Sequence, residues 1–341
     1  IVAQHTYPDD NPSGTPSDKY ATTLKVTDSS GGIGVAVTTV TVNDVAPVVT
    51  SLSATSPINE DGTSALTGSF TDVGVRDTHT VTIDWGDGTV GPAAVTQGAG
   101  SGTFVASHRY LDDNPSGTSS DSYTVTVMVR DDDAKVGTST TAVTVNNIAP
   151  VVTSVSATSP VNEGATSMLT GSFSDVGGLD THTATIDWGD GTTSAGGVDS
   201  ASKTVSGSHV YADNGTYTVK VTVTDDDLGV GSSTLVVTVN NVAPTVNAGP
   251  DQTATEGQVV SLAPTTFNDL GTRDTHTATI DWGDGITGAG VVAESPFGPP
   301  GSTSGANGTV SGSHVYADNG AYTVKVTVTD DDLGVGSSTL V

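Results

Sequence analysis

The chain has 341 residues and no cysteine, so disulfide bonds and thiol chemistry are excluded. Only 10 residues are Lys or Arg whereas 38 are Asp or Glu, and the formal net charge is −28. This excess of negative charge argues against nucleic acid and anionic membranes as partners, because both are polyanions. No apolar run reaches the length of a membrane-spanning helix, about 18 residues, so no membrane insertion is expected.

Glutamate is scarce as well, since 34 of the 38 acidic residues are Asp. Aspartate is typical of turns and of sites for hard, oxygen-seeking cations, whereas glutamate is typical of helix surfaces. Gly, Thr, Val and Asp dominate the composition, which favours strands and turns over helices. Two interpretations of the acidity stay open: a solvated acidic surface, or a surface whose charge metal ions neutralise in part.

A long internal repeat is the main feature of the sequence. The pentapeptide Asp-Trp-Gly-Asp-Gly begins at Asp84, Asp187 and Asp281, with spacings of 103 and 94 residues. Ala-Pro pairs that follow Asn-Asp or Asn-Asn recur with the same two spacings and are predicted to be short linkers. The spacings divide the chain into four segments: 1–45, the C-terminal half of a unit; 46–148 and 149–242, complete units; and 243–341, a unit lacking the end of its last strand.

Both ends of the chain fall inside a repeat, which would leave core residues and strand edges exposed. The chain is therefore interpreted as a window from a longer repetitive protein. Alternatively, a neighbouring subunit completes the broken units by adding strands.

Period-two alternation predicts strands within each unit. Tyr217, Val219, Val221 and Val223 are expected on one face, with the intervening Thr and Lys residues on the other. Short strands with turn signals between them, in units of about 95 residues, predict an all-β fold of tandem Ig-like antiparallel β-sandwiches arranged end to end. The one Trp of each unit is expected between the two sheets.

Three motifs together resemble the polycystic kidney disease (PKD) domain family. In the third segment they are the D-W-G-D-G turn at 187–191, His-Val-Tyr at 209–211, and Y-T-V-K-V-T-V-T-D at 217–225. The resemblance implies an Ig-like fold with framework roles for these residues, as found in extracellular arrays, adhesins and accessory domains of secreted hydrolases. Residues 1–45 depart from the pattern, because they lack the D-W-G-D-G turn and have Asp28-Ser29-Ser30 where later units have three aspartates.

No catalytic constellation is expected. All seven histidines occupy repeat positions, so none is left for a unique nucleophilic or zinc site. Asp187 and Asp190 resemble a glycosidase carboxylate pair in residue type only, and the pair occurs once in each unit. Asp87, Asp190 and Asp284 are instead predicted to close a tight turn, and Tyr217 to be a corner residue, so the chain is not expected to be an enzyme.

Acidic residues recur at three places in each unit and make the better case for a site. They are a Glu just before the second strand, two Asp in the loop before the Trp strand, and a run of three Asp before the last strand. In the runs, alternate residues would share a face if the backbone stays extended. The candidate metal ligands are Glu60, Asp72, Asp77, Asp131, Asp133, Glu163, Asp175, Asp180, Asp225, Asp227, Glu256, Asp269, Asp274, Asp330 and Asp332.

The predicted topology places both Asp sets at one pole of a sandwich and the Glu at the other. In a head-to-tail array, Glu163 and the pair Asn240-Asn241 would face the aspartates of the next unit. Such a site looks like the interdomain calcium sites of cadherins, and its crowded carboxylates would suit calcium. The alternative is that the Asp runs are solvated turns that cap strand ends.

The leading hypothesis is a non-enzymatic structural or adhesive segment of a long extracellular or cell-surface protein or filament, stiffened by calcium. Its expected partners are neighbouring repeats, other copies of itself, and ligands on cells or in a matrix. The alternative is a non-catalytic accessory region of a secreted hydrolase, which would need exposed aromatic residues. Aromatics make up only 5% of the chain and fall at core-like positions. The loop from Val291 to Gly308 is a weaker candidate for binding.

Overall fold

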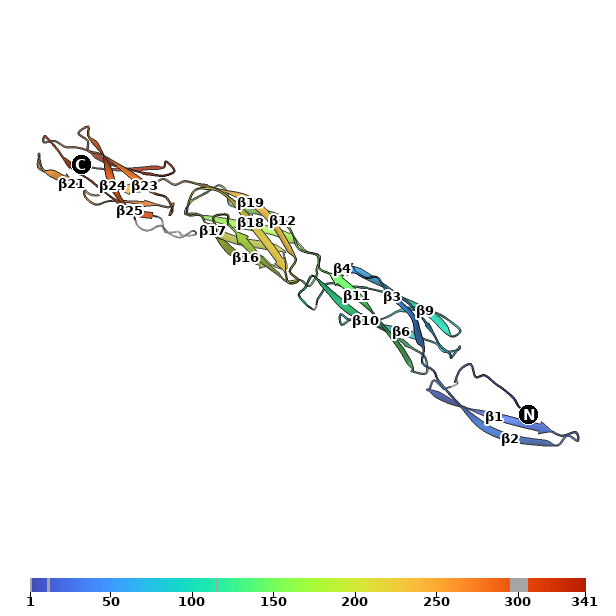
Figure 1. Cartoon of the computed structure of the whole chain (residues 1–341). Coiled ribbons are helices and arrows are strands. Elements are labelled where there is room, and N and C mark those ends of the chain that lie inside the picture. Colours follow the sequence, from blue (N-terminus) through green and yellow to red (C-terminus); the bar gives the residue numbers. More distant parts are fainter. Residues whose placement is uncertain (1, 11–12, 115, 295–305) are drawn as a thin grey trace. The chain divides into compact units, whose positions relative to one another are not determined.

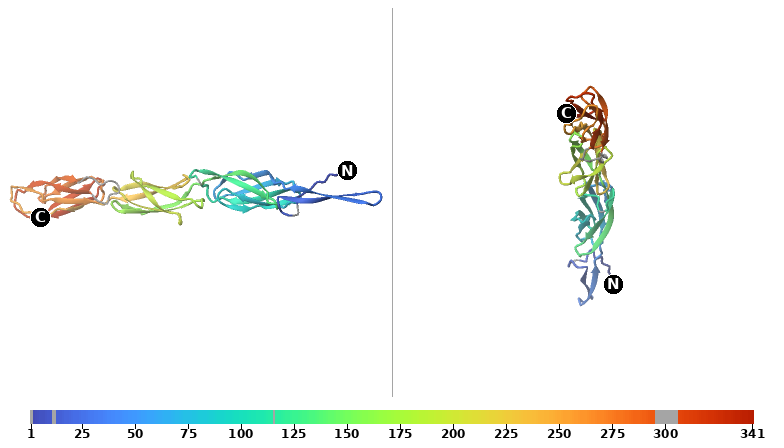
Figure 2. Two further views of the ribbon diagram at one scale, coloured as in Figure 1. Left: turned by 90° about the horizontal axis from the view of Figure 1, so that it is seen from below. Right: turned by 90° about the vertical axis from the view of Figure 1, so that its left-hand side faces the viewer.

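The computed structural model describes residues 2–10, 13–114, 116–294 and 306–341. Within these residues every regular element is a strand (Figures 1 and 2). No helix among them is long and apolar enough to span a membrane. The predicted loop 291–308 lies largely outside the described residues, because 295–305 are not among them.

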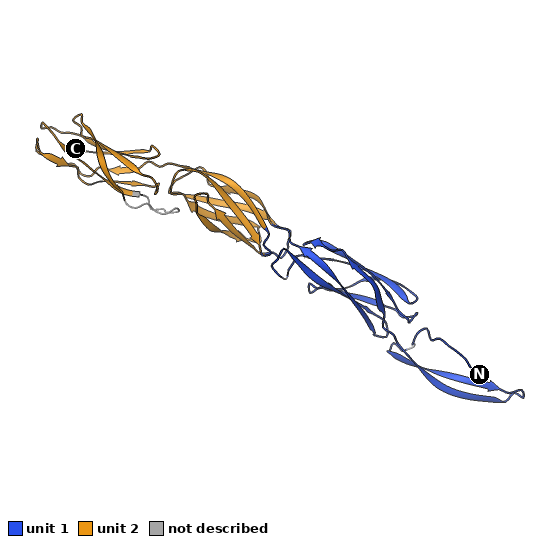
Figure 3. Cartoon of the chain, viewed as in Figure 1, with its two compact units in different colours: residues 1–149, 175–180, 226–229 blue, residues 150–174, 181–225, 230–341 orange. Residues whose placement is uncertain are grey.

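The chain forms two compact units, which Figure 3 distinguishes by colour. Unit 1 contains residues 1–149 and two short loops from the following repeat, 175–180 and 226–229. Unit 2 contains residues 150–174, 181–225 and 230–341. The two loops that group with unit 1 carry aspartates, so this division already associates acidic loops of one repeat with the preceding repeat.

Unit 1 begins with a hairpin, β1 (Ser17–Thr27) and β2 (Ile33–Asn43), which forms a two-stranded sheet of its own. The strands are antiparallel, with Tyr20 opposite Val40. Asp28 closes the connecting turn, because its Oδ1 atom accepts hydrogen bonds from the backbone N–H groups of Ser30 and Gly32 at 2.9 and 2.8 Å.

Unit 1 continues with a two-sheet sandwich, with strand orders β3-β5-β9-β8 and β4-β11-β10-β6-β7. The strands are β3 (Val48–Ala54), β4 (Ile58–Asn59), β5 (Thr63–Thr71), β6 (Thr80–Asp84), β7 (Val90–Pro92), β8 (Ala94–Gly98), β9 (Ser101–Arg109), β10 (Ser120–Arg130) and β11 (Val136–Asn146). Trp85, Phe70 and Phe104 are buried in one core with the valines of β10. The short β4 pairs in parallel with the end of β11, which positions the turn that holds Glu60.

Unit 2 contains a second sandwich around a core that includes Trp188. Its strands are β12 (Val151–Ala157), β13 (Val161–Asn162), β14 (Thr166–Ser174), β15 (His182–Asp187), β16 (Thr193–Asp199), β17 (Thr204–Val210), β18 (Gly215–Asp225) and β19 (Val230–Asn240). They form one continuous order, β12-β14-β17-β16-β15-β18-β19-β13, because β16 pairs with both β15 and β17 and so joins the two layers. The parallel pair β13–β19 holds the turn with Glu163.

A third sandwich in unit 2 surrounds Trp282. Its strands are β20 (Thr245–Asn247), β21 (Val259–Ser261), β22 (Thr265–Asp269), β23 (His276–Asp281), β24 (Thr287–Glu294), β25 (Ala306–Ser311), β26 (Ser313–Val315), β27 (Val324–Asp330) and β28 (Val335–Leu340). Seven of them form the order β20-β22-β25-β24-β23-β27-β28, and β21 pairs with β26.

The burial pattern confirms the period-two prediction. In β18, Val219, Val221 and Val223 are fully buried while Thr218 and Lys220 face solvent. The predicted position of the tryptophans is also confirmed, since all three are no more than 4% exposed within their cores. The fold is therefore all-β, with antiparallel sandwiches in tandem.

Candidate metal centres at the acidic loops

Acidic loops gather into three clusters, and each cluster lies within one compact unit. The first cluster comprises Asp9, Asp10, Asp77, Asp132 and Asp133 in unit 1. The second, also in unit 1, comprises Glu60, Asp112, Asp113, Asp180 and Asp227. The third, in unit 2, comprises Glu163 and Asp274 together with Asp213, Asp269 and Asp330, whose charges act on one or both of them.

Each glutamate of these clusters is fixed to the linker that follows its own sandwich. Glu60 Oε1 accepts a hydrogen bond from the backbone N–H of Ile148 at 2.6 Å, and Glu163 Oε1 accepts one from Val242 at 2.5 Å. Both side chains are at most 2% exposed, and in both the second oxygen, Oε2, has no hydrogen-bond partner among the described residues. In each glutamate, Oε1 therefore holds the linker, and Oε2 is buried without a hydrogen-bond donor among the described residues.

In the second cluster, oxygen atoms converge from separate loops. Glu60, Asp112 and Asp180 each offer a carboxylate oxygen within 4.8 Å of the others, and so do Asp112, Asp113 and Asp227. The backbone N–H of Gly178 donates to the Leu111 carbonyl at 3.0 Å, which fixes the loop of Asp180 beside that of Asp112. Asp112 therefore belongs to both groups.

The first cluster has the same arrangement without a glutamate. Asp9, Asp10 and Asp133 form one group within 4.8 Å, and Asp77, Asp132 and Asp133 form another. The backbone N–H of Val75 donates to the Pro8 carbonyl at 3.1 Å, the counterpart of the bond between Gly178 and Leu111.

In the third cluster, one residue of the Asn240-Asn241 linker contacts an aspartate of the next repeat, whereas Asn240 Nδ2 donates to Asn162 Oδ1 of its own sandwich at 3.3 Å. Asn241 Nδ2 donates to both carboxylate oxygens of Asp330 at 3.1 Å. Asp274 is 1% exposed, and neither of its oxygens has a hydrogen-bond partner among the described residues. Glu163 is among the charges that act on Asp274, so the two carboxyls belong to one electrostatic group.

Burial without a cation makes the charged forms of these carboxyls costly. Desolvation, with the charges of Asp180 and Asp113 added, raises the pKa of Glu60 to about 8. Desolvation, with the charges of Glu163 and Asp269 added, raises the pKa of Asp274 to about 8. In the first cluster, desolvation and the contact with Asp9 raise the pKa of Asp77 to about 8. A bound divalent cation would lower these pKa values, because it would stabilise the charged carboxylates.

Other predicted ligands have protein partners that sequence reasoning missed. Asp72 Oδ1 accepts the N–H of Gly74 at 3.1 Å, and its Oδ2 lies 2.9 Å from Nε2 of His79. Asp269 has the same pair of contacts, with Gly271 at 3.1 Å and His276 at 3.1 Å. Both carboxylate oxygens of each aspartate therefore have partners within their own sandwich. These contacts give Asp72 and Asp269 a structural role.

The Asp runs show the alternation expected of them in two cases out of three. Asp131 and Asp133 are buried with Asp132 exposed, and Asp225 and Asp227 are buried with Asp226 exposed. In the last run Asp330 is buried, but Asp332 is exposed. Asp131 Oδ1 also accepts the N–H of Lys135 at 2.8 Å, so the first residue of that run closes a turn.

One predicted ligand, Glu256, lies apart from these oxygen groups. Glu256 is exposed, unlike its counterparts Glu60 and Glu163. Asp175 is partly exposed, but it offers a carboxylate oxygen within 4.8 Å of one from Asp180 and so adjoins the second cluster. Conversely, Asp9, Asp10, Asp112 and Asp113 belong to the clusters and were missed, although the repeated Asp-Asp-Asn-Pro-Ser-Gly segment was a visible signal. Asp132 and Asp213 were missed as well.

The D-W-G-D-G segments are turns, as predicted. Asp190 Oδ1 accepts the backbone N–H of Thr192 at 3.0 Å and its hydroxyl at 2.6 Å. Its Oδ2 lies 2.7 Å from Nε2 of His209, whose ring stacks on Trp188. The Tyr217 hydroxyl donates to the Asp213 carbonyl at 2.9 Å, which agrees with the predicted corner role.

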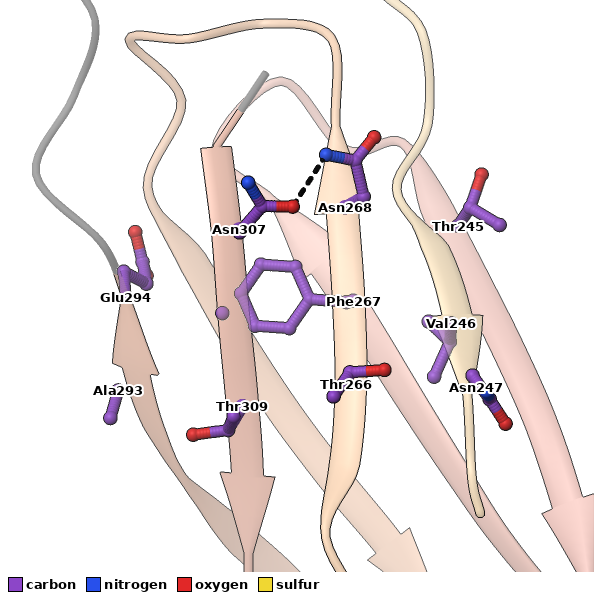
Figure 4. A pocket seen from close by; sticks show the side chains of 11 residues that line it. Thr245, Val246, Asn247, Thr266, Phe267, Asn268, Ala293, Glu294, Asn307 and Thr309 are labelled. Carbon is purple, nitrogen blue, oxygen red and sulfur yellow. Dashed lines mark hydrogen bonds between the residues drawn. The ribbon is translucent and has the colours of Figure 1, made fainter. Parts of the chain in front are cut away.

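A hollow on the surface of the third sandwich offers no comparable chemistry (Figure 4). It has a volume of about 520 Å³ between β20, β22, β24 and β25. Asn268 Nδ2 donates to Asn307 Oδ1 at 2.8 Å across it, and its one aromatic side chain, Phe267, is 3% exposed. Its one carboxyl, Glu294, accepts the N–H of His276, so the lining holds no acid–base pair.

The fold defines the chain as a tandem array of Ig-like β-sandwich modules. Residues 147–239 match the family model of the PKD domain, so the resemblance predicted from the D-W-G-D-G, His-Val-Tyr and Tyr217 motifs is confirmed for that segment. A search of curated proteins found no match.

The chain is similar to the solved structure of a tetra-tandem repeat in the extending region of a large adhesion protein, with a TM-score of 0.50. The two are 19% identical over 96% of this chain and 82% of that one, so the likeness concerns the fold alone. The ectodomain of human desmocollin-1 gives a TM-score of 0.28 at 14% identity, over 95% of this chain and 64% of that one. The ectodomain of mouse nectin-like molecule 4 gives a TM-score of 0.28 at 16% identity, over 61% of this chain and 73% of that one.

Proposed function

We propose that this chain is a structural, adhesive repeat segment of a long extracellular or cell-surface protein, and that calcium binds at its acidic clusters and stiffens the connections between modules. The observation that carries the proposal is the divided role of Glu60 and Glu163. In each, one buried oxygen holds the linker and the other has no protein donor. An ion at the second oxygen would connect the linker to the aspartates beside it.

The donor set supports calcium over other metals. Every ligand in the clusters is an oxygen atom, and the chain has no cysteine. Calcium accepts six to eight oxygen ligands in flexible geometry, whereas magnesium demands a tight octahedron and keeps several waters. Glu60, Asp112 and Asp180 would hold the ion in the second cluster, and Glu163, Asp213 and Asp274 in the third. The ion would neutralise the buried carboxylates of Glu60, Glu163 and Asp274.

The fold supports the structural role. The neighbour with the same fold is described as the extending region of a large adhesion protein, and we extend that role to this chain. An accessory substrate-holding region would need exposed aromatic platforms, but Trp85, Trp188 and Trp282 are all buried. Other copies of the chain remain the proposed partners, through exposed strand edges.

The proposal is tested on the whole chain by thermal unfolding and small-angle scattering, in calcium, in magnesium and with a chelator. We expect calcium to raise the melting temperature and to lengthen and narrow the distribution of particle dimensions, because an ion that binds only the folded clusters stabilises them. Magnesium should do so only weakly. Identical melting curves and identical scattering in all three conditions would contradict the proposed calcium binding.

A further inference from the structure

The second cluster contains a buried aspartate that the site around Glu60 does not use. Asp113 is 0% exposed, and neither of its carboxylate oxygens has a hydrogen-bond donor among the described residues. It lies in a group with Asp112 and Asp227, whose oxygens are within 4.8 Å of one another. Three carboxylates therefore meet in a buried place.

The first cluster repeats this arrangement. Asp10 is 3% exposed and Asp133 is 2% exposed, and they form a group with Asp9. Asp10 Oδ2 and Asp133 Oδ1 have no hydrogen-bond partner among the described residues. Like Asp113, each has a carboxylate oxygen aimed at another carboxylate rather than at a donor.

In the third cluster, an amide group stands where the other two clusters have a buried carboxylate. The loops differ in length but correspond at their start, because the hydroxyl of Tyr123 donates to the Asp112 carbonyl at 3.1 Å and that of Tyr217 donates to the Asp213 carbonyl at 2.9 Å. The residue after Asp112 is Asp113, whereas the residue after Asp213 is Asn214.

The Asn214 amide bridges the two carboxylates that correspond to Asp112 and Asp227. With its amide oriented to suit its neighbours, Asn214 Nδ2 donates to Asp332 Oδ2 at 2.7 Å and to Asp213 Oδ1 at 3.0 Å. An amide group has two N–H donors, so it can join two carboxylates without an ion. A carboxylate at the same position has none.

We propose that these three-aspartate groups of the first and second clusters each bind a divalent cation, in the second cluster in addition to the ion at Glu60. The all-oxygen ligands favour calcium, and the Asn214 amide replaces this ion in the third cluster. The ligands are Asp9, Asp10 and Asp133 in the first cluster, and Asp112, Asp113 and Asp227 in the second. This inference rests on the proposed calcium binding at the glutamate-bearing groups. It adds that the clusters of unit 1 bind more calcium than the cluster of unit 2.

The test counts the calcium ions bound to the whole chain by native mass spectrometry, with equilibrium dialysis as a second measurement. Asp113→Asn gives the second cluster the amide of the third, and Asn214→Asp does the reverse. Asp199→Asn is the charge-matched control, because Asp199 is exposed at the end of β16 and accepts the backbone N–H of Ala201. We expect Asp113→Asn to bind one ion fewer than the wild type, Asn214→Asp one more, and Asp199→Asn the same number.

The melting temperature without calcium gives a second readout. Asp113→Asn should melt higher than the wild type with a chelator near pH 8, because its amide replaces a repulsive contact with hydrogen bonds. An unchanged ion count in Asp113→Asn would overturn the second site while leaving the proposed function in place. A higher melting temperature with an unchanged count would show that a shared proton, and not a cation, occupies the group. A wild-type chain that binds no calcium would instead overturn the proposed function.

Discussion

Glu163 accepts the backbone N–H of Val242 at 2.5 Å through one carboxylate oxygen, while its other oxygen has no hydrogen-bond partner among the described residues. The same relationship joins Glu60 to Ile148 at 2.6 Å. A residue that only capped a turn would be satisfied by the first bond. The second oxygen is buried, and the proposed ion would join it, and with it the linker, to the neighbouring aspartates.

Glu163→Gln should keep the linker bond and weaken calcium binding in the third cluster. The Gln carbonyl can still accept the Val242 N–H, but the negative charge beside Asp274 is lost. We expect calcium affinity at this cluster to fall roughly tenfold, which corresponds to about 1.4 kcal/mol. Calorimetric titration measures the change. Glu256→Gln is the matched control, because Glu256 is exposed, and an equal loss in both variants would contradict a specific role for Glu163.

The calcium-free chain should lose stability as the pH rises. The pKa values of Glu60, Asp77 and Asp274 are each raised to about 8 in the folded chain, whereas the unfolded values are near 4. Between about pH 4 and about pH 8 the folded state therefore binds more protons than the unfolded state, and the free energy of unfolding falls as pH rises. Chemical denaturation with a chelator across this range measures it. Calcium should flatten the curve; a calcium-free stability that rises with pH would contradict these shifts.

Asp190→Ala should destabilise one sandwich. The substitution removes the hydrogen bonds to Thr192 and the contact with His209. We expect a loss of about 1–3 kcal/mol in the free energy of unfolding, seen as a lower melting temperature for one transition of the chain. Asp190→Asn keeps an acceptor for the Thr192 groups and should lose less. Equal losses in the two variants would show that the turn does not depend on the Oδ1 acceptor.

Gly137→Ala should loosen the attachment of a linker to the last long strand of its sandwich. A Cβ atom at Gly137 would lie 2.0 Å from the Pro47 carbonyl oxygen, so the backbone must shift. We expect a cost of about 1–3 kcal/mol, as for other overpacked sites. Gly98→Ala is the control in the same sandwich, because its Cβ would meet nothing within 4 Å. Equal melting temperatures for both variants would show that the linker yields without cost.

Local pattern in the sequence predicted the strands, the buried tryptophans and the Asp190 turn, because each depends on neighbours in the chain or on alternation along one strand. It also identified Glu163 and Asp274 as members of one candidate site. It missed Asp113, because the Asp-Asp-Asn-Pro-Ser-Gly segment reads locally as a tolerated loop insertion. Only the approach of residues 226–229, more than a hundred positions later, shows what that loop faces.

The role of Asp72 was missed for a related reason. His79 was recognised only as a repeat position, and nothing in the spacing of the two residues shows that their side chains meet inside the sandwich at 2.9 Å. Equivalent sequence positions also differ in environment, as the exposed Glu256 shows beside the buried Glu60 and Glu163.

The most direct test of calcium binding at the clusters is a crystal structure grown with calcium, with anomalous scattering recorded to locate the ions. The account predicts anomalous peaks among the carboxylates of Glu60, Asp112 and Asp180, and of Glu163, Asp213 and Asp274. Maps without such peaks, with these carboxyl groups hydrogen-bonded directly to one another, would contradict it.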